Sequence, residues 1–488
     1  MAKNLMIQGT MSGVGKSILT AGILRVLMQD GYRVAPFKSQ NMALNSFVTP
    51  DNREIGRAQA LQAVAAGRQP SSDMNPILLK PMGDTTSQVI VNGLPIGNMP
   101  AREYFRMKRS LIPDIRAAYD RLAKDSDIIV IEGAGSPVEI NLRENDIVNM
   151  GLAEILDAPV ILAGDIDPGG VFAQLLGTIS LFSREERDRV KGLIINKFRG
   201  DVTLLEPGLE MFGAYSDIPF AGIVPYVKLD LDEEDSVSER LRRGSETAAD
   251  AKVRIAVVRL PFISNYTDFT IFENIPGVSL FYATSPEELE DIDIVILPGT
   301  KNTLGDLTWL YKEGFAAKIG ELAGNGGLVI GICGGFQMLG RCITDPECSE
   351  TGGEAKGLSL LHVDTVFEKT KNLRQVSGTI GNLTGVYAPL SGMEVTGYEI
   401  HMGESTADTD TFPVIANENV LGTYIHGIFD SADLTQALLK LVYDKKGITE
   451  PVPEIEGAFV HQEKELNRLA DVLRQSLDWE MIYRIIGI

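Results

Sequence analysis

The sequence predicts a two-domain α/β protein with a parallel sheet in each half. The 488 residues are too many for one ordinary hydrophobic core. Short apolar runs alternate with helical patterns in both halves, which is typical of a parallel sheet covered by helices. Residues 231–251, between the halves, are charged and poor in apolar side chains, so we interpret them as a linker.

The first domain, residues 1–230, begins with an apolar strand and continues in regular alternation. Short apolar runs of strand length predict buried strands, and longer runs with helical spacing predict helices. The expected strands are 5–8, 33–37, 128–131, 160–163 and 192–195, and the expected helices are 17–29, 55–66 and 171–181.

The second domain, residues 252–488, repeats this alternation and is expected to have a flavodoxin-like sheet. Its expected strands are 253–258, 294–297 and 328–332. Residues 460–488 predict one or two amphipathic helices, whose apolar face contains Leu466, Leu469, Val472 and Leu473.

Composition excludes several classes of partner. The formal net charge is −21 and Lys and Arg form no long run, so we expect no nucleic-acid partner. No stretch reaches the ~18 apolar residues of a membrane span, so we expect no membrane partner. Three cysteines, an odd and low count, together with an N-terminus that does not resemble a signal peptide, indicate the cytoplasm. The oligomeric state stays open.

A phosphate-binding loop follows the first strand, in the segment Gly9-Thr10-Met11-Ser12-Gly13-Val14-Gly15-Lys16-Ser17. The strand–loop–helix context is the one that this motif requires. Its first glycine lies one place earlier than in the strict pattern, in the manner of dethiobiotin synthetase and its relatives. Lys16 is expected to neutralise phosphate charge and Ser17 to ligate Mg²⁺. The expected ATP contacts are Thr10, Gly13, Val14, Gly15, Lys16 and Ser17.

Polar residues at three later strand ends extend this site. Glu132 is expected to hold Mg²⁺ directly or through water, and Asp165 is a second candidate ligand that could equally cap a turn. Asn196 could read the nucleotide base or belong to a polar turn, and the sequence does not decide between the two.

Two polar runs, residues 38–46 and 80–88, also follow strands. Ligands of open α/β sheets bind at the carboxyl ends of strands, so both runs are expected to contact the acceptor substrate. The candidate contacts are Lys38, Gln40, Asn41, Asn45, Lys80 and Ser87.

A glycine-rich turn around Cys333 predicts a nucleophile at the end of strand 328–332. Taken alone, it would fit a buried structural cysteine better. His426 ends another strand, however, and can reach Cys333 as its base if both belong to one sheet. Gly299 and Gly334 are expected to offer the N–H groups of an oxyanion hole.

The partner of the histidine is left open by the sequence. Many related glutamine-hydrolysing domains carry Glu two residues after the histidine, where this chain has Ile428, and the next acid is Asp430. Either a Cys–His dyad operates or another acid orients His426. His401 could line a substrate pocket or be structural, and the structural interpretation is slightly favoured.

These motifs together resemble the cobyric acid synthases, glutamine amidotransferases of cobalamin biosynthesis. The resemblance covers the whole chain, and its most specific part is the run Lys38-Ser39-Gln40-Asn41-Met42-Ala43-Leu44-Asn45-Ser46. It implies that ATP and glutamine are used to amidate four carboxylates (b, d, e and g) of adenosylcobyrinic acid a,c-diamide. It further implies acyl phosphates at the first domain, a thioester on Cys333 and proton transfer by His426.

Three other functions are weighed against this one. A related amidotransferase could act on another polycarboxylate, as a cobyrinic acid a,c-diamide synthase or a cell-wall lipid amidating enzyme. A partitioning ATPase would usually carry a second Lys early in the loop, where this chain has Met11. A degenerate domain with only a docking role would not need the intact Cys333 and His426.

Overall fold

The computed structural model describes residues 2–82, 85–231, 251–408 and 413–488. The chain forms two compact units, which we describe separately. Unit 1 contains Met1–Ala43, Arg53–Asp235 and Gln462–Ile488, and unit 2 contains Leu44–Asn52 and Ser236–His461. The predicted class, two α/β domains with parallel sheets, is confirmed.

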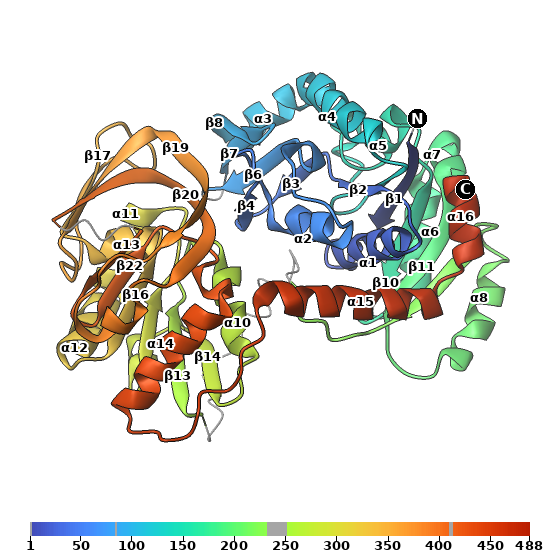
Figure 1. The fold of residues 1–488 in the computed structure, drawn as a ribbon. Coiled ribbons are helices and arrows are strands. Elements are labelled where there is room, and N and C mark those ends of the chain that lie inside the picture. The colour runs from blue at the N-terminus through green and yellow to red at the C-terminus, as the bar shows by residue number, and fades with distance from the viewer. Residues whose placement is uncertain (1, 83–84, 232–250, 409–412) are drawn as a thin grey trace. The chain divides into compact units, whose positions relative to one another are not determined.

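Unit 1 is built on a six-stranded parallel sheet with the order β12-β11-β10-β1-β9-β2 (Figure 1). Its strands are β1 (Lys3–Gly9), β2 (Val34–Phe37), β9 (Ile128–Glu132), β10 (Val160–Asp165), β11 (Val190–Phe198) and β12 (Phe220–Pro225). Apart from the edge strand β12, they are mostly apolar and buried, as strands covered on both faces must be. The carboxyl ends of all six strands therefore meet at one edge.

Helices cover both faces of this sheet, and each face has its own apolar core. One face carries α1 (Lys16–Gln29), α15 (Ala458–Ser476) and α16 (Trp479–Ile486), and the other carries α4 (Ile112–Lys124), α5 (Met150–Ile155) and α6 (Val171–Leu181). The remaining helices are α2 (Arg57–Ala65), α3 (Ala101–Met107), α7 (Arg184–Arg189) and α8 (Glu206–Phe212).

A second, four-stranded sheet of unit 1 has the order β3-β6-β7-β8. Its strands are β3 (Gln40–Met42), β6 (Ile77–Pro81), β7 (Thr86–Val91) and β8 (Leu94–Pro100). β3 contains part of the first polar run, and β6 and β7 contain parts of the second, so this sheet brings together two segments that are far apart in sequence. The short strand β5 (Glu54–Gly56) precedes α2, which therefore begins two residues later than predicted.

Unit 2 contains a six-stranded sheet with the order β14-β13-β15-β16-β22-β21, parallel except for the edge strand β21. Its strands are β13 (Val253–Val258), β14 (Val278–Ala283), β15 (Ile294–Leu297), β16 (Leu328–Ile332), β21 (Val414–Asn417) and β22 (Val420–Thr423). The five parallel strands follow the flavodoxin order, as predicted. The helices are α10 (Thr270–Glu273), α11 (Thr303–Lys312), α12 (Phe315–Gly324), α13 (Gly334–Leu339) and α14 (Ala432–Lys445).

A second sheet of unit 2 has the order β18-β17-β19-β20. Its strands are β17 (Cys342–Asp345), β18 (Gly353–Lys356), β19 (Val363–Thr379) and β20 (Glu394–Ala407), and β4 (Ser46–Val48) also belongs to this unit. Tyr398 of β20 forms an antiparallel bridge with His426, so the second sheet reaches the carboxyl ends of the first.

The compact units differ from the predicted boundaries at both ends of the chain. The tail was expected in the second domain, but Gln462–Ile488 packs in unit 1. Leu466, Leu469 and Leu473 bury their side chains against α1 and the central sheet, and Arg25 of α1 pairs with Glu463 at 2.7 Å. Residues 44–52 leave the first half and join unit 2. The predicted linker lies, except for its end residues 231 and 251, outside the described residues.

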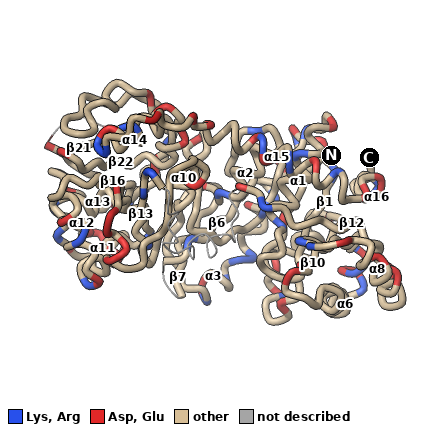
Figure 2. Tube along the Cα trace, turned by 90° about the horizontal axis from the view of Figure 1, so that it is seen from below, with Lys and Arg blue, Asp and Glu red and all other residues tan. Residues whose placement is uncertain are grey.

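Charge is spread through both units. Lys and Arg are interspersed with Asp and Glu along the part of the chain that the structure describes (Figure 2). No helix among those residues is long and apolar enough to cross a bilayer.

The tail makes a testable contribution to the stability of unit 1. Leu473 is fully buried, so Leu473→Ala should lower the free energy of unfolding by about 2–5 kcal/mol. Gln475→Ala, an exposed site on the same helix, is the matched control. Equal urea denaturation curves for the two variants would contradict the packing of α15 on unit 1.

Candidate active sites

The phosphate loop of unit 1 joins β1 to α1 and depends on glycine at two points. Gly13 and Gly15 have φ angles of 74° and 89°, in the left-handed region that favours glycine. A Cβ atom on Gly15 would also lie 2.4 Å from Nδ2 of Asn196. A side chain at position 15 would strain the backbone and collide with the side chain of Asn196.

Asn196 and Lys197, near the end of β11, hold the loop by side-chain hydrogen bonds. Asn196 donates from Nδ2 to the carbonyl of Val14 at 2.8 Å, and Lys197 donates from Nζ to the carbonyl of Gly13 at 2.5 Å. Asn196 therefore stabilises the loop itself. Its predicted contact with the nucleotide base stays a prediction.

The side chains of the loop make contacts with neighbouring strand ends. Lys16 donates to the carbonyls of Met11 and Gly135, at 3.0 and 3.2 Å, and Thr10 donates to Gln174 at 3.3 Å. Gly135 follows β9, so the ammonium of Lys16 lies between the loop and the end of the next strand.

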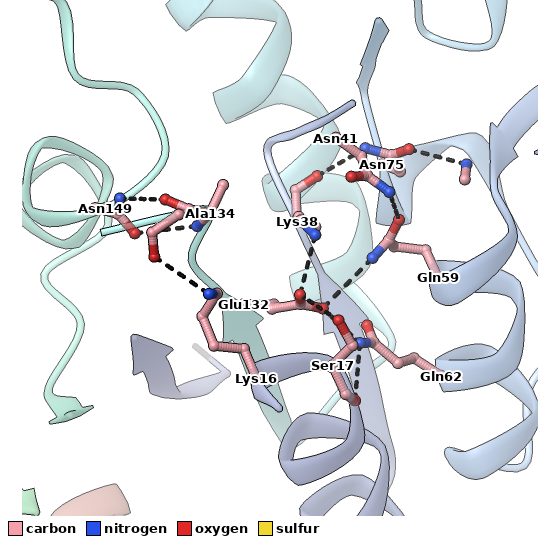
Figure 3. A network of polar contacts seen from close by, with 12 residues as sticks. Lys16, Ser17, Lys38, Asn41, Gln59, Gln62, Asn75, Glu132, Ala134 and Asn149 are labelled. Atoms are coloured by element: carbon pink, nitrogen blue, oxygen red, sulfur yellow. Dashed lines mark hydrogen bonds and ion pairs between the residues drawn. The ribbon is translucent and has the colours of Figure 1, made fainter. Parts of the chain in front are cut away.

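Glu132, at the end of β9, is the centre of a buried polar network (Figure 3). Its Oε1 accepts from Ser17 at 2.7 Å and from Lys38 at 3.0 Å. Its Oε2 accepts from Gln62 at 2.6 Å and from Gln59 at 3.5 Å. Burial would raise the pKa of Glu132, but the charge of Lys38 and these hydrogen bonds outweigh burial and hold the pKa below its ordinary value.

The donor set at Glu132 fits a magnesium ion held together with a nucleotide. A Ser hydroxyl and a carboxylate that already touch are oxygen ligands of the kind that Mg²⁺ takes. Over the described ranges, no three His, Cys, Asp or Glu side chains gather as a metal site. Phosphate and water would therefore supply the remaining ligands. Asp165 instead pairs with Lys197 at 2.9 Å and accepts the N–H of Asp167 at 2.9 Å, so its metal role stays a prediction.

Apart from Asn45, the predicted acceptor contacts lie in two places. Lys38, Gln40 and Asn41 lie at or next to β3, where Asn41 donates to Gln59 at 2.8 Å and Gln40 accepts from Tyr104 at 2.5 Å. Lys80 and Ser87 lie on the adjoining strands β6 and β7.

Two of these candidates have surroundings that the sequence did not predict, and their acceptor roles stay predictions. Lys80 forms a buried ion pair with Glu54 at 2.9 Å, which favours a structural role for it. Asn45 belongs to unit 2, where its side-chain oxygen is buried and accepts no hydrogen bond.

Cys333 of unit 2 sits on a tight turn between β16 and α13. It has a φ angle of 52°, unusual for a residue with a side chain, and its N–H donates to the carbonyl of Thr423 at 2.8 Å. A Cβ atom on Gly335 would lie 1.9 Å from the carbonyl oxygen of Leu297. The sharp turn thus requires glycine, as expected of a nucleophile elbow.

His426 and Cys333 are brought together because their strands are neighbours. β16 and β22 pair in parallel with Ile332 opposite Thr423, and the side chain of Cys333 lies close enough to His426 to contribute to the raised pKa of the imidazole. Nδ1 of His426 donates to Oδ2 of Asp268 at 2.6 Å, and the N–H of Gly427 donates to Oδ1 of Asp268 at 3.1 Å. The three side chains form a Cys–His–Asp chain.

The charge of Asp268 sets the protonation of His426. Burial alone would lower the pKa of His426, but Asp268 and the Cys333 side chain outweigh burial and raise it to about 10. His426 is therefore an imidazolium at neutral pH, which suits a residue that must give a proton to departing ammonia.

The two predicted oxyanion glycines border this centre. A Cβ atom on Gly299 would lie 3.1 Å from Cε1 of His426, and one on Gly334 would lie 3.1 Å from the N atom of Thr300. The structure therefore brings Gly299, Gly334, Cys333 and His426 together. The oxyanion role of the glycine N–H groups stays a prediction.

His401 is fixed by its own contacts. Nδ1 donates to the carbonyl of Gly403 at 2.6 Å, and its ring stacks on Tyr424 with 3.7 Å between centroids. These contacts favour the structural interpretation of His401.

Sequence reasoning missed Asp268, Gln59 and Gln62. Asp268 lies 158 residues before its histidine, and its one signal was its position after β13, a strand of the same sheet. Gln59 and Gln62 are polar residues three apart in an Ala-rich helix, which places both on one face of α2. This spacing could have predicted that both side chains contact one buried polar group.

Comparison with known proteins gives the same two-part division. Residues 5–238 match the CobQ/CobB/MinD/ParA nucleotide binding domain, and residues 254–434 match the CobB/CobQ-like glutamine amidotransferase domain. The chain is 52% identical to the cobyric acid synthase of Lachnoclostridium phytofermentans, over 99% of both chains. It is 49% identical to that of Ruminiclostridium cellulolyticum, over 100% of this chain and 97% of the relative. This chain belongs to the cobyric acid synthase family.

A third member of the family, from a Thermoanaerobacter species, is 48% identical over 99% of both chains. The structure of PurLQS from Thermotoga maritima aligns with 40% of this chain and 99% of its own, at 19% identity and a TM-score of 0.31. Family membership makes the protein a glutamine-hydrolysing ligase with a nucleotide-binding domain.

The Cys–His–Asp chain predicts a specific defect in Asp268→Asn. The amide cannot stabilise the imidazolium, so kcat for glutamine hydrolysis should fall by about 100-fold or more. The pKa of His426 should also fall, since its largest raising cause is removed, and the alkaline limit of activity should move to lower pH. Asp430→Asn is the control, and an equal loss in that variant would contradict the assignment of Asp268.

The network around Glu132 predicts a defect confined to the ATP-dependent reaction. Glu132→Gln removes the charge that pairs with Lys38, so ammonia-dependent ATP hydrolysis should fall by about 100-fold or more. Glutamine hydrolysis without acceptor should stay at the level of Glu206→Gln, an exposed control. Full ammonia-dependent activity in Glu132→Gln would refute a role for this carboxylate.

Proposed function

We propose that the protein amidates carboxylates b, d, e and g of adenosylcobyrinic acid a,c-diamide, yielding adenosylcobyric acid, with one ATP and one glutamine for each amide. One observation carries this proposal: the chain holds two separate reaction centres of matching chemistry. Unit 2 has Cys333, His426 and Asp268 for releasing ammonia, and unit 1 has a phosphate loop with Glu132 and Lys38 for activating a carboxylate. The names of the relatives support a corrinoid acceptor.

The glutamine half begins with attack of the Cys333 sulfur on the γ-carboxamide. The N–H groups at Gly299 and Gly334 would receive the developing oxyanion. His426 protonates the departing ammonia, and a thioester remains on Cys333. His426 then takes a proton from water, which hydrolyses the thioester to glutamate, while Asp268 keeps the imidazole oriented.

The synthetase half uses charge and position. The N–H groups of the loop and Lys16 would hold the phosphates of ATP. Ser17 and Glu132 would hold Mg²⁺, which supplies charge neutralisation at the phosphates when bound. The acceptor carboxylate attacks the γ-phosphorus to form an acyl phosphate and ADP. Ammonia then displaces phosphate and leaves the amide, with Lys38, Gln40 and Asn41 as candidate contacts of the acceptor.

The test compares two nitrogen sources in one variant. Cys333→Ala should lose ATP-dependent amidation of adenosylcobyrinic acid a,c-diamide with glutamine and keep it with ammonium chloride, because the synthetase centre is separate. Mass spectrometry of the product should show four added amides with the wild type.

Two outcomes would contradict the proposal. Loss of ammonia-dependent activity in Cys333→Ala would show that the two centres are not separate. A wild-type enzyme with glutaminase activity but no corrinoid-stimulated ATP hydrolysis would refute the acceptor. Cys342→Ala is the control, because this half-buried thiol contacts Glu354 and lies outside the centre.

A further inference from the structure

Residues Leu44–Asn52 are an arm that leaves unit 1 after Ala43 and returns to it at Arg53. It directly continues the polar run of Lys38–Met42, and it belongs to unit 2. Val48 of the arm shares an apolar cluster with Tyr398 and Ile400 of β20. Gln375 of β19 fixes the far end, because its N–H donates to Asn52 at 3.2 Å and its side chain donates to the carbonyl of Val48.

The peptide groups of Ser46 contact two different elements of unit 2. The N–H of Ser46 donates to Oδ1 of Asn265 at 3.2 Å. The carbonyl of Ser46 accepts from the hydroxyl of Tyr398 at 3.0 Å. The ring of Phe47 lies against the ring of Tyr398, with 5.1 Å between centroids.

Both of these elements position the catalytic histidine. Tyr398 exchanges two backbone hydrogen bonds with His426, at 2.8 and 3.1 Å, and its ring stacks on the imidazole at 5.4 Å with an interplanar angle of 23°. Asn265 begins the turn that carries Asp268, and its carbonyl accepts the N–H of Asp268 at 3.1 Å. The arm thus touches one residue on each side of the His426–Asp268 pair.

We infer that the arm is a working part of the glutaminase centre: it positions His426 through Tyr398 and Asp268 through Asn265, and it transmits the state of the acceptor-binding run to glutamine hydrolysis. The inference rests on the proposed function, since it takes Lys38, Gln40 and Asn41 as acceptor contacts. Tyr398 is a positioning residue, because it acts through His426.

Coupling of glutamine hydrolysis to acceptor binding prevents the loss of ammonia. Ammonia released without an activated carboxylate is lost, so an enzyme with two centres gains if glutaminase is fast only when the acceptor is bound. The arm is nine residues long and has no covalent connection to unit 2 at either end, so a shift of Asn41 or Ala43 on acceptor binding reaches Ser46 within a few bonds. A ligand that binds more tightly with the arm in one position shifts the arm toward that position. The difference in its affinity for the two positions sets the size of that shift, and with it the change in glutaminase activity.

The experiment uses the full chain with Tyr398→Phe and Phe47→Ala. Tyr398→Phe keeps the stacked ring and removes the hydrogen bond to Ser46, and Phe47→Ala removes the ring contact. Each loses one contact of ordinary strength, so kcat for glutamine hydrolysis should fall by about 3- to 10-fold with little change in KM for glutamine. The stimulation of glutaminase by ATP and adenosylcobyrinic acid a,c-diamide should fall toward onefold. Thr396→Ala, an exposed site on the same strand, is the matched control.

The outcomes separate this inference from the proposed function. Ammonia-dependent amidation should stay within about twofold of the wild type in both variants, because unit 1 is unaltered. Unchanged glutaminase and unchanged stimulation would overturn the inference. A parallel loss of glutaminase, ammonia-dependent amidation and thermal stability would overturn it too, because the arm would then be only structural. A lower basal rate with full stimulation would overturn the transmission. Failure of the proposed function would be visible in the wild type alone, as absence of corrinoid amidation with ammonia.

Discussion

The chemistry of unit 2 depends on one buried ion pair, between His426 and Asp268. Each partner is nearly excluded from water, and the charge of Asp268 offsets the burial that would otherwise lower the pKa of His426. The pair is assembled by the order of the sheet, since β22 delivers His426 beside the elbow of Cys333 and the turn after β13 delivers Asp268. Tyr398 and Asn265 hold the two partners from outside, which is why a segment as remote in sequence as Leu44–Asn52 can matter to the glutaminase.

Unit 1 also maintains a buried charge, with a different set of residues. Glu132 is a buried carboxylate whose charge is maintained by Lys38, Ser17, Gln59 and Gln62. Two of these donors, Ser17 and Lys38, belong to the phosphate loop and to the predicted acceptor run, so the carboxylate connects these two segments. Gly15 leaves room for Asn196, which together with Lys197 fixes the loop from β11. Both centres lie at the carboxyl ends of parallel strands, where open α/β sheets place their ligands.

The sequence predicted those features that are encoded locally. Strands β13, β15 and β16 begin and end where the apolar runs do, and the elbow at Cys333 follows from its glycines. What it could not predict depends on contacts between distant segments. The helical spacing of apolar residues in the tail predicted that Leu466, Leu469 and Leu473 share a buried face. It did not predict that this face packs against α1. The polar run from Lys38 gave no sign that its last residues join unit 2. Asp268 could not be predicted from the residues beside His426, because the sheet brings it in from the other end of the domain.

A nuclear magnetic resonance titration of the four histidines tests the ion pair most directly. With ¹⁵N-labelled histidine and assignment by His426→Gln, the imidazole of His426 should remain protonated through neutral pH and ionise near pH 10. In Asp268→Asn its ionisation should move to clearly lower pH, with the other three histidines unchanged. Ionisation of His426 near the ordinary value of about 6.5 in the wild type, with no change in Asp268→Asn, would contradict the account.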